Sequence, residues 1–143
     1  MAKYGKPRSA KGLATFCARV ADDKLATNIV LMNLSKIETA PADFFVMCSC
    51  DSDTQVRAVA DEIIRQAKQT GLDKPNMEGA EAGEWILLDF FDVVVHVMLT
   101  GKRKYYNLEK LWGDASFMVL NDNGEPRVLK QDKVFKLISG EEI

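Results

Sequence analysis

Apolar residues in the first third of the chain change from a helical to an extended pattern. Between Ser9 and Leu25 they recur at intervals of three and four positions, which predicts an amphipathic helix. Two continuous apolar runs follow, NIVLMNL at Asn28–Leu34 and DFFVMCS at Asp43–Ser49, separated by a polar loop that holds Pro41. Short runs of this kind are typical of buried strands. The pattern therefore predicts one helix followed by two strands.

The strongest helical signal in the chain begins at Ser52. Ser52 and Gln55 have the three-residue spacing of a capping box, and Gly71 supplies a stop signal. The positions between them have the i, i+3, i+4, i+7 spacing of an amphipathic helix, with apolar side chains at Val56, Val59, Ala60, Ile63, Ile64 and Ala67. We expect a helix between Ser52 and Gly71, followed by a loop over Leu72–Gly83.

The run WILLDFFDVVVHVM, from Trp85 to Met98, contains the only histidine of the chain. A single strand of this length would be unusually long, so the run predicts two strands joined by a tight turn. With Phe90 and Phe91 as a two-residue turn, Asp89 faces Asp92, Leu87 faces Val94 and Trp85 faces His96.

Alternation along the two strands gives this hairpin two different faces. One face is uniformly aliphatic and predicts a core beneath helices: it carries Ile86, Leu88, Val93, Val95 and Val97. The other face is mixed, which predicts partial cover by another element or contact with a partner: it carries Trp85, Leu87, Asp89, Asp92, Val94, His96 and Met98.

The last third of the chain predicts a helix and a hairpin. Apolar residues within Lys104–Trp112 indicate a helix, and apolar runs flank the turn signal Asn123-Gly124. Helices alternating with strands, then a hairpin, predict an α/β fold with a mixed sheet and flanking helices. We expect one domain, in which residues 1–115 form the main part with a basic N-terminal arm and residues 116–143 form an extension.

Charge and cysteine content narrow the function classes. The net charge of −2 argues against a general nucleic-acid coat, although Lys3, Lys6, Arg8 and Lys11 precede any acidic residue. This basic arm and a second cluster, Lys102-Arg103-Lys104, are either solvated or in contact with a phosphate backbone. The cysteines Cys17, Cys48 and Cys50 are odd in number and lack the CxxC spacing of zinc modules, which indicates free thiols. With no secretory signal or membrane-length apolar stretch, these features predict a cytoplasmic protein.

The histidine and the two aspartates do not form a catalytic arrangement. Asp92 and His96 are four strand residues apart, about 13 Å, too far for a hydrogen-bonded dyad. Asp89 and Asp92 are either turn residues exposed to solvent or ligands of a cation. No nucleotide-binding, serine-hydrolase or zinc-protease motif is present in the chain. The sequence therefore predicts a binding protein, not an enzyme, with no metal and no cofactor.

Four motifs in order resemble the ribosomal silencing factor S family, also called Iojap-related. They are ADFFVMCSCDSDTQVRAVADEI, the pair Glu78-Gly79, EWILLDFFDVVVHVM and KYYNLEKLW, within a match from about Asp22 to Ala115. The resemblance implies a fold similar to nucleotidyltransferases without enzymatic activity. It also implies binding to the large ribosomal subunit through the ribosomal protein numbered fourteen. Occupation of that site would block joining of the small subunit and repress translation when nutrients are scarce.

The resemblance also implies which residues bind the partner. Its strand motif corresponds to Trp85, Leu87, Asp89, His96 and Met98, and its helix motif to Tyr105, Tyr106, Leu108, Glu109 and Trp112. Lys102, Arg103 and Lys104 would then contact ribosomal RNA. The alternative is that Leu108, Leu111 and Trp112 form the core face of their helix.

The family usually has glycine where this chain has Phe91. A tight hairpin turn needs a positive φ, which is costly for phenylalanine, so the turn could be wider and the pairing could slip by one residue. Such a slip would exchange the two faces of the hairpin.

The sequence also allows other functions. The chain could be an assembly factor for the large subunit, or an enzyme similar to nucleotidyltransferases that uses Asp89 and Asp92 with a divalent metal. The apolar face could also support a homodimer.

Overall fold

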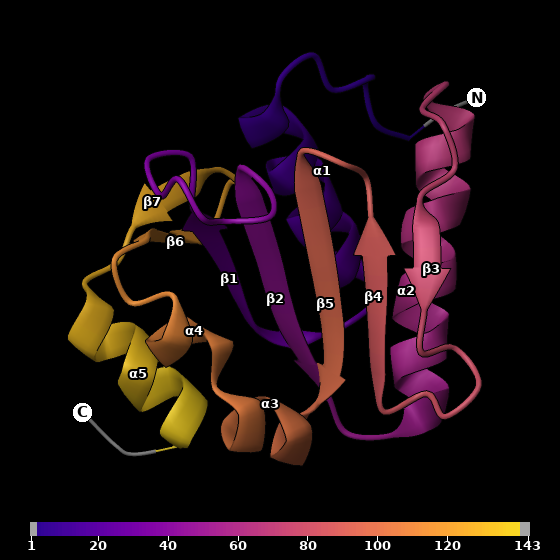
Figure 1. The fold of residues 1–143 in the computed structure, drawn as a ribbon. Coiled ribbons are helices and arrows are strands. Elements are labelled where there is room, and N and C mark those ends of the chain that lie inside the picture. The colour runs from indigo at the N-terminus through magenta and orange to yellow at the C-terminus, as the bar shows by residue number, and fades with distance from the viewer. Residues whose placement is uncertain (1–2, 141–143) are drawn as a thin grey trace.

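The computed structural model describes residues 3–140, which form a mixed sheet with helices on both faces (Figure 1). The strand order is β3-β4-β5-β2-β1-β6-β7. Every neighbouring pair is antiparallel except β2 with β5, which is parallel. The predicted α/β class with a mixed sheet is confirmed. The strands are β1 Thr27–Asn33, β2 Phe44–Cys50, β3 Asn76–Glu78, β4 Trp85–Asp89, β5 Val93–Leu99, β6 Ser116–Leu120 and β7 Pro126–Val128.

The two long helices, α1 (Ala10–Asp23) and α2 (Asp53–Gln69), both follow serine caps; the cap at Ser52 was predicted, and Ser9 was predicted as the start of the first helix. Ser9 Oγ accepts a hydrogen bond from the Gly12 amide at 3.0 Å, and Ser52 Oγ accepts one from the Gln55 amide at 3.1 Å. Gln55 Oε1 accepts from Asp51, one residue before the cap, at 3.0 Å. The two serine bonds satisfy amide groups that the first helical turn would otherwise leave unpaired, and the glutamine bond satisfies an amide just before the helix.

The sheet has an apolar core on each face. The aliphatic face of the β4–β5 hairpin packs beneath α1 and α2 in the first core, as predicted. The second core lies on the mixed face, where Phe45, Met98, Phe117 and Val134 are buried together. Val134 comes from α5 (Gln131–Ser139), a helix that was not predicted. The short edge strand β3 was also missed, inside the predicted loop Leu72–Gly83.

The predicted register of the β4–β5 hairpin is wrong by two residues, but its two faces are correct. Leu87 pairs with His96, and Asp89 pairs with Val94 instead of facing Asp92. The two-residue turn consists of Phe91 and Asp92, one position later than expected. Moving a tight turn by one residue changes the pairing by two, so each side chain keeps its face.

The predicted helix Lys104–Trp112 is two shorter helices, α3 (Thr100–Tyr106) and α4 (Leu108–Leu111). Asn107 separates them with φ of 48°, in the left-handed region, which asparagine tolerates better than most residues. The hairpin predicted around Asn123-Gly124 is confirmed as β6 and β7, which pair with each other. Because β6 also pairs with β1, this hairpin extends the main sheet.

The three cysteines are free and buried, as predicted. Burial raises the pKa of Cys48 to about 12 and that of Cys50 to about 11, so both thiols are protonated at neutral pH. Within residues 3–140, no helix is long and apolar enough to cross a membrane.

Phe91 occupies a backbone conformation that favours glycine. Its φ is 78°, and its side chain is 84% exposed. Its amide donates to Asp89 Oδ1 at 2.8 Å, and the Asp92 amide donates to the Phe90 carbonyl at 3.1 Å. The turn is therefore tight in spite of the phenylalanine.

The substitution Phe91→Gly should stabilise the protein by about 0.5–1 kcal/mol. A left-handed residue with a Cβ costs about 1–2 kcal/mol, partly offset by the greater unfolded-state entropy of glycine. Urea denaturation of the two proteins measures the difference in free energy of unfolding. Phe91→Ala is the control, because it removes the ring but keeps the Cβ. Equal stability of the glycine and alanine variants would contradict this account.

Candidate functional site

Two residues predicted to face a partner and one predicted to contact RNA are enclosed by the protein itself. Met98 and Glu109 are 0% exposed and Arg103 is 1% exposed. The reason is the second layer of helices: α3 packs on β5 and β2, α5 packs on β1 and β6, and α4 packs on α5. Met98, Glu109 and Arg103 therefore do not present side chains to a partner, and these three assignments are corrected.

Arg103 and Glu109 form a buried ion pair that joins α3 and α4. Glu109 Oε2 lies 3.1 Å from Arg103 Nε and 3.0 Å from Nη2. Arg103 Nη1 donates to Ser49 Oγ at 3.0 Å and to the Asn28 carbonyl, which is turned toward it at an irregularity in β1. Burial lowers the pKa of Arg103, and Glu109 opposes that shift. The pair holds the turn between α3 and α4 against β1 and β2.

His96 is a buried, neutral side chain, 3% exposed. Trp85 Nε1 donates to His96 Nδ1 at 3.1 Å, so the predicted proximity of these two residues is confirmed although they are not direct cross-strand partners. Burial, with a smaller contribution from the charge of Arg103, lowers the pKa of His96 to about 4. The predicted contact of His96 with a partner is also corrected, because Trp85 and Phe45 cover its ring.

A chain of aromatic rings leads from His96 to the protein surface. The Trp85 ring lies 4.9 Å from that of Tyr106, which lies 5.1 Å from that of Tyr105. Exposure increases along this chain, from half-buried Trp85 to Tyr106 at 48% and Tyr105 at 81%. We call Trp85, Tyr105 and Tyr106 the aromatic patch. Exposed aromatic side chains that are fixed by buried neighbours are typical of the centre of a protein interface.

The other predicted site residues differ in how far they are exposed to solvent. Leu108 and Trp112 are half-buried against the second core, as the structural alternative predicted, whereas Leu111 is 70% exposed and is not part of the core. Leu87 is half-buried on the same sheet face as Trp85. Asp89 is also half-buried, and its carboxylate accepts the Phe91 amide in the turn.

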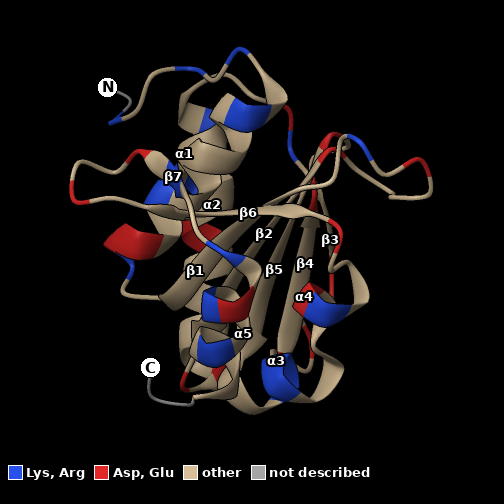
Figure 2. Cartoon of the chain, turned by 90° about the vertical axis from the view of Figure 1, so that its left-hand side faces the viewer, with Lys and Arg blue, Asp and Glu red and all other residues tan. Residues whose placement is uncertain are grey.

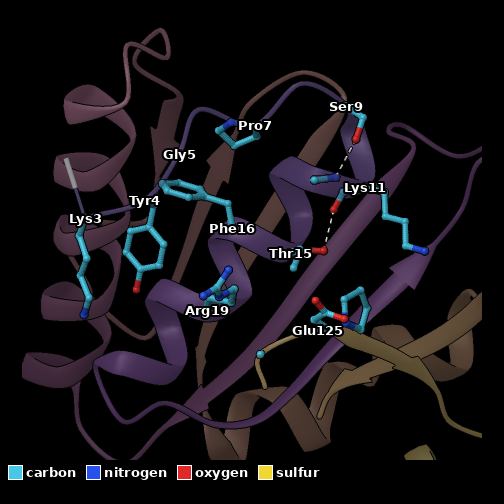
Figure 3. Close-up of a pocket in the computed structure, with 13 residues that line it drawn as sticks. Lys3, Tyr4, Gly5, Pro7, Ser9, Lys11, Thr15, Phe16, Arg19 and Glu125 are labelled. Atoms are coloured by element: carbon cyan, nitrogen blue, oxygen red, sulfur yellow. Dashed lines mark hydrogen bonds between the residues drawn. The ribbon is translucent and has the colours of Figure 1, made fainter. Parts of the chain in front are cut away.

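The basic N-terminal arm folds back on α1 (Figure 3). The Tyr4 ring lies 5.4 Å from that of Phe16, its hydroxyl donates to Asp23, and Lys3 Nζ lies 2.9 Å from the same carboxylate. The N-terminal arm, α1 and the β6–β7 turn line an open hollow of about 650 Å³. It has lysine and arginine on its walls but no histidine or cysteine, so it lacks a nucleophile–histidine pair.

The described residues, 3–140, contain no group of three or more histidine, cysteine, aspartate or glutamate side chains that could hold a metal ion. Asp89 and Asp92 lie at the β4–β5 turn, where Asp92 is exposed and its carbonyl accepts the amides of Asp43 and Phe44. The aromatic patch, formed by Trp85 of β4 and two tyrosines of α3, is the exposed aromatic cluster on this side of the sheet, and its large amphipathic side chains would suit contact with another macromolecule.

Arg103→Met should destabilise the protein by about 3–5 kcal/mol, because it leaves the Glu109 carboxylate buried without a counter-charge. Urea denaturation at pH 7 measures this loss. The double variant Arg103→Met, Glu109→Leu should recover much of the stability, because it removes both charges. If the single and double variants are equally unstable, the charge pairing is not the cause.

Acidification should weaken the fold before most carboxylates titrate. The pKa of His96 is about 4 in the folded state and near 6.5 in the unfolded chain, so the unfolded state binds the proton more readily between these values. Stability should fall by about 2 kcal/mol between pH 7 and pH 5. Urea midpoints at several pH values measure this, with His96→Phe as the comparison. An equally steep decline in that variant would assign the effect to another group.

The sequence matches a family model and named relatives over most of its length. Residues 7–136 match the model described as "Ribosomal silencing factor during starvation". The chain is 45% identical over 105 residues to the ribosomal silencing factor of Bacillus subtilis (strain 168), covering 73% of this chain and 88% of that protein. It is 33% identical over 78 residues to the mouse protein named mitochondrial assembly of ribosomal large subunit protein 1, covering 52% of this chain and 34% of the mouse protein.

A solved structure has the same fold. The crystal structure of a Chromobacterium violaceum protein superposes with a TM-score of 0.70 and 35% identity, covering 74% of this chain and 88% of the other. The family match begins in the basic arm and extends through β6, β7 and most of α5. The chain belongs to the ribosomal silencing factor family.

Proposed function

We propose that this protein binds the large ribosomal subunit through the ribosomal protein numbered fourteen and blocks joining of the small subunit. The mechanism is steric, because a protein bound at a subunit-joining surface adds an unfavourable free energy to association of the two subunits. Family membership supports the ribosome as target, and the aromatic patch is the observation that supports a protein-binding surface. No catalytic step is required.

The aromatic patch has the physical properties of such a contact. Tyr106 and Trp85 are held by ring contacts and by the Trp85–His96 hydrogen bond, so binding would order few additional side chains. Beside it, a hollow of about 390 Å³ is lined by Leu99, Gly101 and Lys102 together with both tyrosines. Leu87 extends the same face. Tyrosine and tryptophan side chains combine a large apolar area with a hydrogen-bonding group, which suits a protein partner.

Tyr105→Ala should weaken binding to large subunits by at least about 30-fold, the effect expected of a central interface aromatic. Tyr105 is 81% exposed, so its removal should leave the fold intact. Co-sedimentation of the protein with purified large subunits measures the affinity. Phe91→Ala is the matched control, because Phe91 is equally exposed but lies at the opposite end of β4. Loss of binding in both variants, or in neither, would contradict the proposal.

Steric blocking needs a second measurement. When small subunits are added to the bound complex, fewer joined ribosomes should form than with the Tyr105→Ala protein, as measured by sucrose-gradient sedimentation. Unchanged joining in the presence of bound wild-type protein would remove the silencing mechanism and leave binding alone.

A role in assembly of the large subunit is the second candidate. It is supported by the printed name of the mouse relative, and it would use the same docking surface at an earlier stage. Accumulation of immature large subunits during rapid growth of a deletion strain would favour assembly. The third candidate, an enzyme that uses Asp89 and Asp92 with a divalent metal, predicts that nucleotide and metal raise the unfolding temperature. A homodimer remains a prediction.

A further inference from the structure

Three lysines from three different helices meet around one groove. The groove, of about 520 Å³, lies between α3, α4 and α5. Lys104, Lys110 and Lys136 line it, one from each helix, with Phe135 on its apolar wall and Asp132 as its one carboxylate. Figure 2 shows basic segments on all three helices at the face turned toward the viewer. We call this the lysine groove.

Among residues 3–140, the lysine groove has three lysines and one carboxylate, so positive charge is in excess. Lys102 lies 3.8 Å from Glu84 and Arg103 is paired with Glu109, but Lys104, Lys110 and Lys136 have no ion pair with any residue between 3 and 140. Lys110 lies over the Phe135 ring at 5.9 Å, which fixes its direction. Lysines that line one groove repel one another, and a bound anion would relieve that repulsion.

The wall of the groove between α3 and α4 is formed by Asn107, whose Oδ1 is buried without a partner among the described residues. Because that oxygen has almost no accessible surface, a ligand in the groove would not contact it. The lysines therefore carry the recognition, and the groove matches an anionic ligand.

We propose that the lysine groove binds the sugar–phosphate backbone of RNA on the large ribosomal subunit. The three ammonium groups would contact phosphate oxygens. The proposal rests on the proposed function for its partner. It also replaces the RNA contact expected from Lys102, Arg103 and Lys104, because Arg103 is buried and Lys102 lies near Glu84. Since Lys104 precedes Tyr105 in the chain, protein and RNA contacts would be adjacent.

The salt dependence of binding tests the proposal. Affinity of the full chain for purified large subunits is measured by co-sedimentation at several KCl concentrations. In the variant Lys104→Gln, Lys110→Gln, Lys136→Gln, the slope of log affinity against log salt should be smaller by about 2–3, one for each lost phosphate contact. The matched control replaces three exposed lysines elsewhere, Lys24, Lys68 and Lys74, by glutamine and should keep the wild-type slope.

The outcomes separate the groove from the proposed function. If wild-type protein pellets and all three proteins have the same slope, the RNA contact is wrong while ribosome binding stands. If wild-type protein does not pellet, the proposed function fails. Fluorescence anisotropy with a fluorescein-labelled RNA duplex at low salt then tests whether the groove binds RNA. Loss of duplex binding in the groove variant but not in the control variant would support the RNA site, and equal duplex binding by all three proteins would overturn it. If the groove binds a polyglutamate peptide but not the RNA duplex, the RNA proposal is wrong and the ligand is an acidic protein segment.

Discussion

The fold depends on burying both faces of its two central strands. Every residue of β2 is buried, and only the last residue of β5 is partly accessible. Because alternate side chains of a strand point to opposite faces, a doubly buried strand needs a layer of helices on each side. The long helices α1 and α2 supply one layer. The other is built from α3, α4 and α5, which are much shorter and could not be stable without tertiary contacts.

The ion pair between Arg103 and Glu109 connects that second layer to the sheet. Its two side chains come from adjacent short helices, and Arg103 also binds polar groups of β1 and β2. A buried pair of this kind contributes little net stability compared with apolar side chains, but it strongly disfavours arrangements in which one charge lacks its partner. It therefore fixes where α3 ends and α4 begins. The position of Tyr105 and Tyr106 follows from that placement.

The aromatic patch and the lysine groove lie on this same layer, so one set of buried contacts positions both. The patch is anchored through Trp85 to His96 in the second core, and the groove is anchored through Phe135 on α5. Binding surfaces that are ordered before contact lose less conformational entropy on association. A layer that presents aromatic rings beside lysines without an ion pair among residues 3–140 fits the proposed contacts with protein and RNA of a ribosomal subunit.

The sequence by itself determined the elements whose patterns are local. The helices at Ser9 and Ser52, the strands β1, β2, β4 and β5, the two faces of the hairpin and the family motifs all follow from periodicity, caps and residue identity. Only the tertiary structure decided which polar residues of the KYYNLEKLW region and of the Lys102-Arg103-Lys104 cluster are buried. Arg103 and Lys104 are neighbours in sequence, but Arg103 is buried beside the Glu109 carboxylate, whereas Lys104 is exposed and lines the lysine groove. The exposure of a charged side chain depends on contacts with α5 and β1, which are distant in sequence and leave no periodic signal.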